Sequence, residues 1–165
     1  MLGTERTFLT LLTENDLPAM LEMAGEPDTF QYIRKLRIMT ASEYARFLQV
    51  KLEQIRDKTG FHWAVWLKAP RTFIGAVNLN PVAGTAMMQI GCQLKRAYWH
   101  QGFASELMKC IRDFGLKEAG LKTIYGVFEK DNQASRRLLE KLDFVWQDSR
   151  EEQGIELEIH KYPAS

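Results

Sequence analysis

The stretch Leu94–Glu106, LKRAYWHQGFASE, joins the end of an apolar segment to the start of an amphipathic one and contains Gly102. This pattern predicts a β-strand ending near Leu94, a short basic and aromatic loop, and a helix starting at or just after Gly102. A helix N-terminus offers unpaired N–H donors and the positive end of a dipole, and a glycine lets a ligand approach the backbone. The stretch therefore predicts an anion site for phosphate or pyrophosphate, with positive charge added by Lys95 and Arg96, unless it is an ordinary glycine-containing helix entry.

Outward from this stretch, hydrophobic periodicity divides the chain into strands and helices. Segments with strand character are 7–12, 62–67, 73–79, 85–94, 123–128, 144–146 and 155–159. Helical spacing follows Asn15, begins again near Thr40, which has capping-box spacing to Glu43, and covers 103–114 and 132–142. Short connections favour an antiparallel meander, and the strand–helix–strand unit at 85–128 can place one parallel pair in the centre. The order predicts a single mixed α/β (α+β) domain over residues 1–165, built on a largely antiparallel sheet.

Composition excludes several classes of protein. The chain has 165 residues, of which 45% are hydrophobic and 26% charged, which is ordinary for a globular domain and unlike a disordered chain. Its 22 lysines and arginines against 21 acidic residues give a net charge of +1, which does not favour nucleic-acid binding. The two cysteines and three dispersed histidines form no metal-ligand pattern, so we expect no metal. The small number of cysteines fits a reducing compartment. No leader or membrane segment is evident, so we expect a cytoplasmic protein.

A second informative segment, 129–144, reads EKDNQASRRLLEKLDF. Asn132 and Ser135 have the spacing Asn-x-x-Ser at the start of the predicted helix, and the helix ends at the sequence Glu-Lys-Leu. Asp143 follows directly, and an aspartate tolerates the left-handed conformation that often ends a helix.

The loop sequence WHQGFASE (99–106) and segment 129–144 resemble two motifs of the GNAT superfamily of N-acetyltransferases, and in particular its ribosomal-protein N-terminal acetyltransferase (RimJ/RimL-like) branch. Trp99 replaces the Gln or Arg of the superfamily loop, as is frequent in that branch, whereas His100 replaces a glycine. The resemblance covers essentially the whole chain in order. It implies a sheet of about seven strands flanked by about four helices and splayed at a V-shaped acyl-CoA site.

The resemblance further implies acetyl-CoA as cosubstrate, with its pyrophosphate on the loop and its pantetheine arm between two splayed strands. Backbone groups of one strand would pair with that arm as an added strand would. Asn132 is expected to bond the arm or to hold a water near the reacting thioester. The cofactor-binding residues implied in this way are Cys92, Gln93, Leu94, Gln101, Gly102, Phe103, Ala104, Ser105 and Asn132. For the Cys92 thiol itself, a small core residue is favoured over a nucleophile.

For catalysis, the resemblance implies direct attack of an amine on the thioester, with the enzyme positioning the reactants. Many members use a tyrosine as general acid where this chain has Leu139, so Ser135 is the candidate acid, unless it only completes a helix turn. A glutamate of the central strand is here Gln89, which leaves Glu129 as candidate base, unless it is a helix-terminus partner. Tyr32 and Gln89 are expected to contact the acceptor.

Without a strong base, an α-amine with a pKa of ~7.7–8.0 is an easier acceptor than an alkyl amine with a pKa of ~10.4. We therefore expect acetylation of a protein or peptide N-terminal α-amine. A small amine is the alternative: a polyamine, an amino sugar or an aminoglycoside, attracted by the acidic residues Glu129, Asp131, Glu151 and Glu152. A non-catalytic acyl-CoA-binding module is a further alternative, and the sequence leaves a homodimer open.

Overall fold

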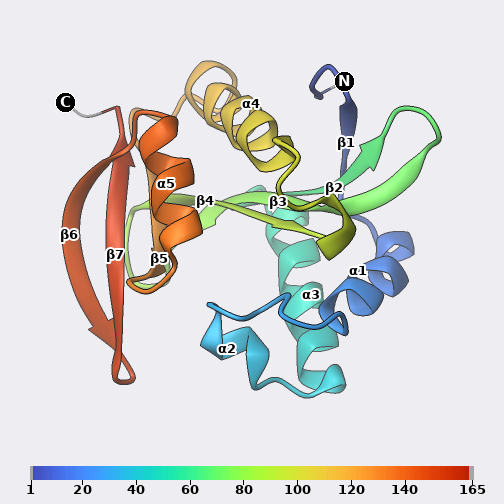
Figure 1. Cartoon of the computed structure of the whole chain (residues 1–165), viewed down its shortest axis with the longest axis horizontal. Helices are drawn as coiled ribbons and strands as arrows, with labels where there is room; N and C mark the ends of the chain where they lie inside the picture. Colours follow the sequence, from blue (N-terminus) through green and yellow to red (C-terminus); the bar gives the residue numbers. More distant parts are fainter. Residues whose placement is uncertain (1, 164–165) are drawn as a thin grey trace.

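Seven strands form one continuous sheet in the computed structural model, which describes residues 2–163 (Figure 1). The strands are β1 (Thr7–Leu11), β2 (Phe61–Leu67), β3 (Thr72–Pro81), β4 (Met88–Leu94), β5 (Ile124–Glu129), β6 (Val145–Glu152) and β7 (Ile155–Tyr162). Their order across the sheet is β1-β2-β3-β4-β5-β7-β6. Every neighbouring pair is antiparallel except β4 and β5, which confirms the predicted meander and its one central parallel pair.

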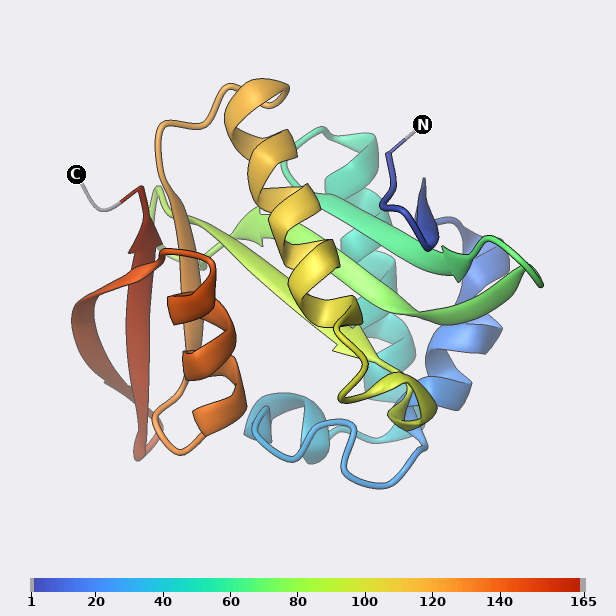
Figure 2. The same cartoon turned by 45° about the horizontal axis from the view of Figure 1, so that its top comes forward.

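Helices cover both faces of this sheet. They are α1 (Leu17–Ala24), α2 (Arg34–Arg37), α3 (Ala41–Arg56), α4 (Phe103–Lys117) and α5 (Gln133–Lys141), with 3-10 turns η1 (Glu14–Asp16) and η2 (Arg96–Tyr98). In Figures 1 and 2, α4 lies on one face, α1 to α3 on the other, and α5 beside β5 and β7. None of the helices in residues 2–163 is long and apolar enough to cross a membrane.

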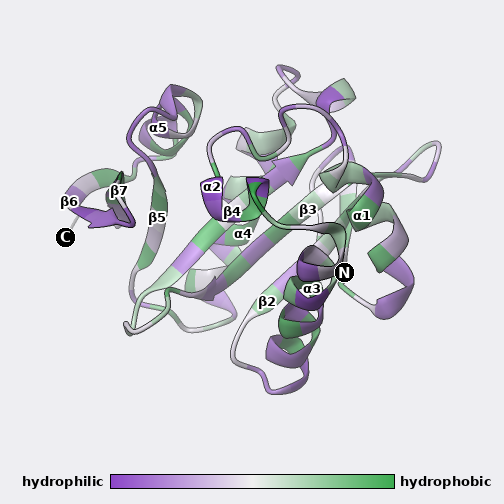
Figure 3. Ribbon diagram, turned by 90° about the horizontal axis from the view of Figure 1, so that it is seen from below, coloured by the Kyte–Doolittle hydropathy of each residue, from purple (hydrophilic) through white to green (hydrophobic). Residues whose placement is uncertain are grey.

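Each face has its own hydrophobic core. On the α4 side, Leu107 and Ile111 are fully buried with Val77 of β3. On the other side, Leu48 of α3 and Met23 of α1 pack in a second cluster against the sheet. Figure 3 shows hydrophilic and hydrophobic residues alternating along α3, as expected for a helix with one buried stripe. The core on the α4 side includes Ile90 and Leu94, so it holds β4 against α4.

The central parallel pair is held by a single matched position, Gln89 of β4 with Tyr125 of β5. Beyond it the two strands separate, so residues 90–94 and 126–129 have no ladder partner across the gap within the described chain. Figures 1 and 3 show β4 and β5 running apart. The sheet is therefore splayed in a V, as the family resemblance implied.

Local hydrogen bonds explain where the elements differ from expectation. The fourth strand begins at Met88 rather than Thr85, because Thr85 Oγ1 donates to the Val82 carbonyl (2.8 Å) and accepts from the Met87 N–H (3.1 Å), which keeps the segment in a turn. The predicted capping box is confirmed, since Thr40 Oγ1 accepts from the N–H of Glu43 at 3.2 Å.

The short helix α2 was not anticipated, because its four residues, RKLR, carry no apolar periodicity that could be recognised. The sixth strand, Val145–Glu152, is longer than the predicted 144–146, because its polar second half is held by pairing with β7 alone. Asp143 adopts φ 67°, which confirms the left-handed helix end expected there.

Candidate functional site

The N-terminus of α4 carries no side-chain cap. The loop before it passes twice through the left-handed region, at His100 (φ 59°) and Gly102 (φ 83°). The first helical bond runs from the Glu106 N–H to the Gly102 carbonyl at 3.2 Å, so the N–H groups of residues 103–105 find no acceptor within residues 2–163. Three free donors and the helix dipole converge here, a geometry that suits a phosphate or pyrophosphate.

The side chains of this loop mostly face away from that site. Gln101 Nε2 donates to the Ala97 carbonyl at 2.7 Å, and the Phe103 ring is buried in the core. A Cβ built on Gly102 would meet only Arg6 Nη2, at 3.5 Å, so the space before the helix is open. Gln101 and Phe103 can therefore contribute only backbone groups to an anion, as can Gly102.

Lys141 is brought to the loop by the fold and was not anticipated. Its Nζ lies 3.4 Å from Ser105 Oγ, which connects the last turn of α5 to the first turn of α4. The residue was visible in the Glu-Lys-Leu motif, but only the packing of α5 beside α4 places its ammonium next to the free N–H groups. It is a second source of positive charge for an anion at this position.

Lys95 and Arg96 were expected to supply that charge, and the structure corrects this. Lys95 Nζ lies 3.5 Å from Glu22 Oε1 of α1, and Arg96 Nη1 lies 3.3 Å from Asp28 Oδ2. Glu22 lies in α1 and Asp28 in the segment that follows, so both cations are held in ion pairs there. Their charge is directed to α1 and its following loop rather than to the N-terminus of α4.

The backbone of β4 offers fewer groups to the gap than predicted. The Lys95 N–H donates to the Ile74 carbonyl of β3 at 2.8 Å, and alternation along an antiparallel ladder then turns the backbone of Gln93 toward β3 as well. The backbone groups of Cys92 and Leu94 face the β5 side. Because the Leu94 carbonyl accepts from the indole N–H of Trp99 at 2.8 Å, it is already satisfied. Gln93 is therefore not positioned to pair with a ligand in the gap through its backbone.

The thiol of Cys92 lies against the core on the α4 face. Burial raises the pKa of this thiol to about 12, so it remains protonated at neutral pH. Because the thiolate is the nucleophilic form of cysteine, this supports the interpretation of Cys92 as a packing residue that contributes its backbone.

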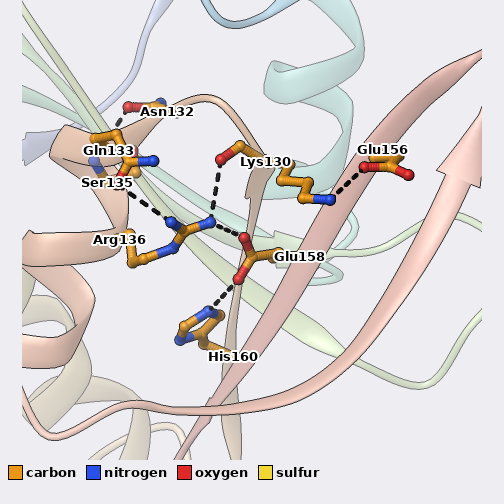
Figure 4. Close-up of polar contacts among 8 residues, drawn as sticks. All are labelled: Lys130, Asn132, Gln133, Ser135, Arg136, Glu156, Glu158 and His160. Carbon is orange, nitrogen blue, oxygen red and sulfur yellow. Dashed lines mark hydrogen bonds and ion pairs between the residues drawn. The ribbon is translucent and has the colours of Figure 1, made fainter.

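The first turn of α5 is fixed from two directions (Figure 4). Asn132 Oδ1 caps the helix by accepting the Ser135 N–H at 3.1 Å, and the Asn132 amide nitrogen has no acceptor among residues 2–163. On the other side, Arg136 is ion-paired with Glu158 of β7 and donates to the Lys130 carbonyl at 3.1 Å. The Ser135 hydroxyl makes no hydrogen bond to any residue from 2 to 163, so it is held in place with its proton uncommitted.

Below this turn lies His160, which is 2% exposed. Its Nε2 lies 3.2 Å from Glu158 Oε1, and its Nδ1 is buried without a partner among the described residues. Burial lowers the pKa of this imidazole, which keeps it neutral and lets it donate from Nε2 to the carboxylate. The ion pair between Arg136 of α5 and Glu158 of β7 thus fixes α5 against β7, and the hydrogen bond from His160 orients the Glu158 carboxylate.

Leu139 occupies the position where many members of the resembled superfamily carry a tyrosine. It is 3% exposed, and a Cβ on Gly126 of β5 would come within 2.5 Å of Leu139 Cδ1. The side chain fills the space over a glycine in β5 and reaches neither the gap nor solvent. A proton donor at this position is therefore absent, as the sequence indicated.

A pocket of about 740 Å³ lies at the C-terminal end of β5, between α2 with its preceding turn and the β6–β7 turn. It brings together two predicted residues, Tyr32 and Glu129. Glu129 Oε1 accepts the N–H of Arg34 at 3.0 Å, so the carboxylate also ties the end of β5 to the start of α2. Gln89 is half-buried at the apex of the V, next to Tyr125, and does not line this pocket among the described residues.

Comparison with known proteins identifies the family of this chain. The family model described as the acetyltransferase (GNAT) domain matches residues 6–145. The chain belongs to the GNAT acetyltransferase family. It is thus an acyltransferase that uses acetyl-CoA as cosubstrate, and the resemblance inferred from its two motifs is confirmed.

Relatives of this chain align with it over most of its length. The uncharacterized N-acetyltransferase YoaA of Bacillus subtilis (strain 168) is 26% identical over 145 residues, which are 87% of this chain and 82% of that protein. Among solved structures, RimL, a ribosomal L7/L12 alpha-N-protein acetyltransferase in complex with coenzyme A, superposes with a TM-score of 0.80 at 13% identity, covering 96% of this chain and 94% of that one.

The spermidine N-acetyltransferase from Vibrio cholerae, in complex with CoA and spermine, superposes with a TM-score of 0.78 at 16% identity, covering 94% of each chain. These likenesses show a shared fold. Enzymes named for a protein N-terminus and for a polyamine both share it, so the fold alone does not select the acceptor of this GNAT domain.

Proposed function

We propose that this protein transfers the acetyl group of acetyl-CoA directly to the α-amine at a protein or peptide N-terminus. The observation that carries the proposal is the V between β4 and β5. Near one side of this V lies the uncapped N-terminus of α4, and the pocket with Glu129 lies where β5 ends. An acyl donor and an amine can therefore meet at the splay from different directions.

The cosubstrate supplies the acetyl thioester, and the residues around the α4 N-terminus fit it. The free N–H groups of residues 103–105, the open space at Gly102 and the ammonium of Lys141 suit the pyrophosphate. The backbone N–H groups of Cys92 and Leu94 suit the amide groups of the pantetheine arm. Asn132, whose amide nitrogen makes no hydrogen bond to residues 2–163, is the proposed side-chain donor to the same arm.

Catalysis then rests on positioning and on proton transfer. An N–H of β4 facing the gap can stabilise the negative charge that develops on the carbonyl oxygen. Ser135 Oγ, with an uncommitted proton on a fixed helix turn, is the proposed acid toward the departing thiolate. Glu129, which lines the pocket, is the proposed acceptor of the ammonium proton.

A second candidate acceptor is a small amine such as a polyamine. The observation in its favour is that Glu129 and Asp131 both line the pocket, since carboxylates attract a polycation. The other acidic pair considered for this role, Glu151 and Glu152, lies on β6 outside the pocket.

We also propose a single acetyltransferase domain that works in the cytoplasm. The outer edge of β6 is unpaired within residues 2–163, and Trp146 on this strand is 58% exposed, an arrangement compatible with a homodimer.

Two measurements on the full chain test the function. Binding of coenzyme A is followed by thermal shift, and release of thiol from acetyl-CoA is followed with peptide and polyamine acceptors near neutral pH. The proposal expects binding and turnover with peptides. Binding without turnover on any amine would indicate a non-catalytic module, and acetylation of polyamines with peptides untouched would transfer the assignment to the second candidate.

A further inference from the structure

The pocket at the end of β5 presents charges of both signs on separate walls. Arg34 and Arg37 line it from α2, and Glu129 and Asp131 line it from the end of β5 and the residues that follow. The bond from the Arg34 N–H to Glu129 Oε1, at 3.0 Å, joins the two walls at their base. The pocket is thus bipolar, with its acidic wall on the strand that borders the splay.

These charges are not neutralised by neighbours. Lys130 and Glu156, the other charged residues of the lining, pair with each other at 2.8 Å. Within residues 2–163, none of the remaining four is in an ion pair at 4.0 Å or less. Arg37 Nη1 donates to the Gln31 carbonyl at 2.6 Å, which orients the guanidinium and leaves its charge in place. Two cations and two carboxylates therefore line the pocket without an ion pair among residues 2–163.

A bipolar pocket selects for a bipolar ligand. The carboxylates draw an ammonium group toward the splay, where the thioester carbonyl would lie. A guanidinium is built to receive a carboxylate through two parallel hydrogen bonds, so the α2 wall favours an anionic group on the same ligand. A linear polyamine that entered the pocket would bring its second cation against the arginines and be repelled.

We propose that the acceptor is an amine that carries a carboxylate close to the reacting nitrogen in space: an N-terminus followed directly by acidic side chains. This rests on the proposed function and narrows its substrate class. The same chemistry occurs in a free dicarboxylic amino acid, and the two sources are separated by the test.

The test uses the full chain, acetyl-CoA and three C-terminally amidated peptides that differ only in charge: Ser-Glu-Glu-Ala, Ser-Gln-Gln-Ala and Ser-Lys-Lys-Ala. Free glutamate and spermidine are assayed alongside. We expect kcat/KM to be about tenfold higher for the acidic peptide than for the neutral one, and lowest for the basic peptide and spermidine. The preference should shrink at high salt, because exposed charges are screened. Acetylation of glutamate with the acidic peptide untouched would keep the chemistry and assign it to the amino acid.

Variants assign the preference to the arginines. The double substitution Arg34→Gln with Arg37→Gln should reduce the acidic-over-neutral ratio to about one, mainly through KM. Lys35→Gln removes one charge from the same helix at a position that does not line the pocket, and should keep the ratio. Equal rates for the three peptides, or faster acetylation of spermidine, would overturn the inference while leaving N-acetyl transfer intact. Coenzyme A binding without thiol release on any acceptor would instead overturn the proposed function and this inference with it.

Discussion

Arg6 and Glu106, a hundred positions apart in the sequence, meet at the entrance to α4, where Arg6 Nη2 lies 2.8 Å from Glu106 Oε1. The same guanidinium donates to the Gln101 carbonyl at 2.9 Å and stacks 3.8 Å above the centre of the Phe103 ring. One side chain from the start of the sheet therefore touches three residues of the candidate pyrophosphate loop. It holds the loop without occupying the place of the anion.

We expect Arg6→Ala to weaken coenzyme A binding by about three- to tenfold, because the loop loses its anchor before the ligand arrives. Glu106 Oε2 is buried without a partner among residues 2–163, so the substitution also leaves a carboxylate without its counter-charge. Adding Glu106→Gln to Arg6→Ala should therefore recover part of the lost stability, measured by urea unfolding. Unchanged coenzyme A affinity in Arg6→Ala would contradict the anchoring role.

Gly102→Glu should abolish the stabilisation by coenzyme A, since a carboxylate at the helix N-terminus occupies and repels the site of the pyrophosphate. The matched control is Gly84→Glu. Both glycines have positive φ, 83° and 73°, and neither has a close packing neighbour, so the backbone strain of about 1 kcal/mol should be similar. Thermal shift with and without coenzyme A separates the two variants. If Gly102→Glu still binds with normal affinity, the placement of the pyrophosphate is wrong.

Ser135→Ala should lower kcat by ~10²–10⁴-fold, the usual contribution of a general acid, with little change in coenzyme A affinity. Stability should change by less than about 0.5 kcal/mol, because the capping bond uses the backbone N–H of Ser135 and not its hydroxyl. Asn132→Ala is the informative contrast, since it removes the cap and should cost about 1 kcal/mol in unfolding free energy. A near-normal kcat in Ser135→Ala would reduce this serine to a helix residue.

Stability should fall in mild acid because of His62. This imidazole is 3% exposed, bonded through Nε2 to Gln54 Oε1 at 2.7 Å, and its Nδ1 is buried without a partner in residues 2–163. Burial, with a smaller effect from the charge of Lys51, lowers the pKa of His62 from 6.5 to about 3. The unfolded chain therefore binds a proton below pH 6.5 that the folded chain does not.

Because the folded pKa is depressed, His62 supports the folded state fully above pH 6.5 and loses up to roughly 1.4 kcal/mol for each pH unit below it. His160, whose pKa burial also lowers, adds in the same direction. Urea unfolding at pH 7 and pH 5 measures the slope. His62→Gln should flatten the part due to His62, and an equally steep slope in that variant would assign the effect elsewhere.

Periodicity and motif spacing predicted the order of the strands along the chain, the presence of one parallel pair and the position of the loop before α4. These are local properties, or follow from short connections. The sequence could not show that Lys95 and Arg96 are held by acidic residues of α1 and of the loop after it, or that Lys141 reaches Ser105. Ion pairs of this kind join segments far apart in the chain, and they depend on how the helices pack.

Dependence on packing between distant segments also explains why the sequence did not predict which backbone groups of β4 face the gap. Strand propensity identifies the segment, but which residues turn their backbone to the gap depends on the register with β3. A shift of one residue would have exposed Gln93 in place of Cys92 and Leu94. The hydrogen bond between the Arg34 N–H and Glu129 likewise depends on the short helix α2, which has too few residues to be recognised from a sequence pattern.

The single matched position between Gln89 and Tyr125 has a mechanical consequence. The part of the molecule that contains β5, α5, β6 and β7 is joined to β4 by one ladder position and to the rest of the protein by packing in the core on the α4 side. A pantetheine arm lying along β4 would supply the strand hydrogen bonds that the β4–β5 ladder lacks. Ligand would then stiffen the protein itself. Amide hydrogens of Cys92 and Leu94 should exchange quickly in the free chain and slowly once coenzyme A is bound, whereas that of Gln93, already engaged with β3, should exchange slowly in both states.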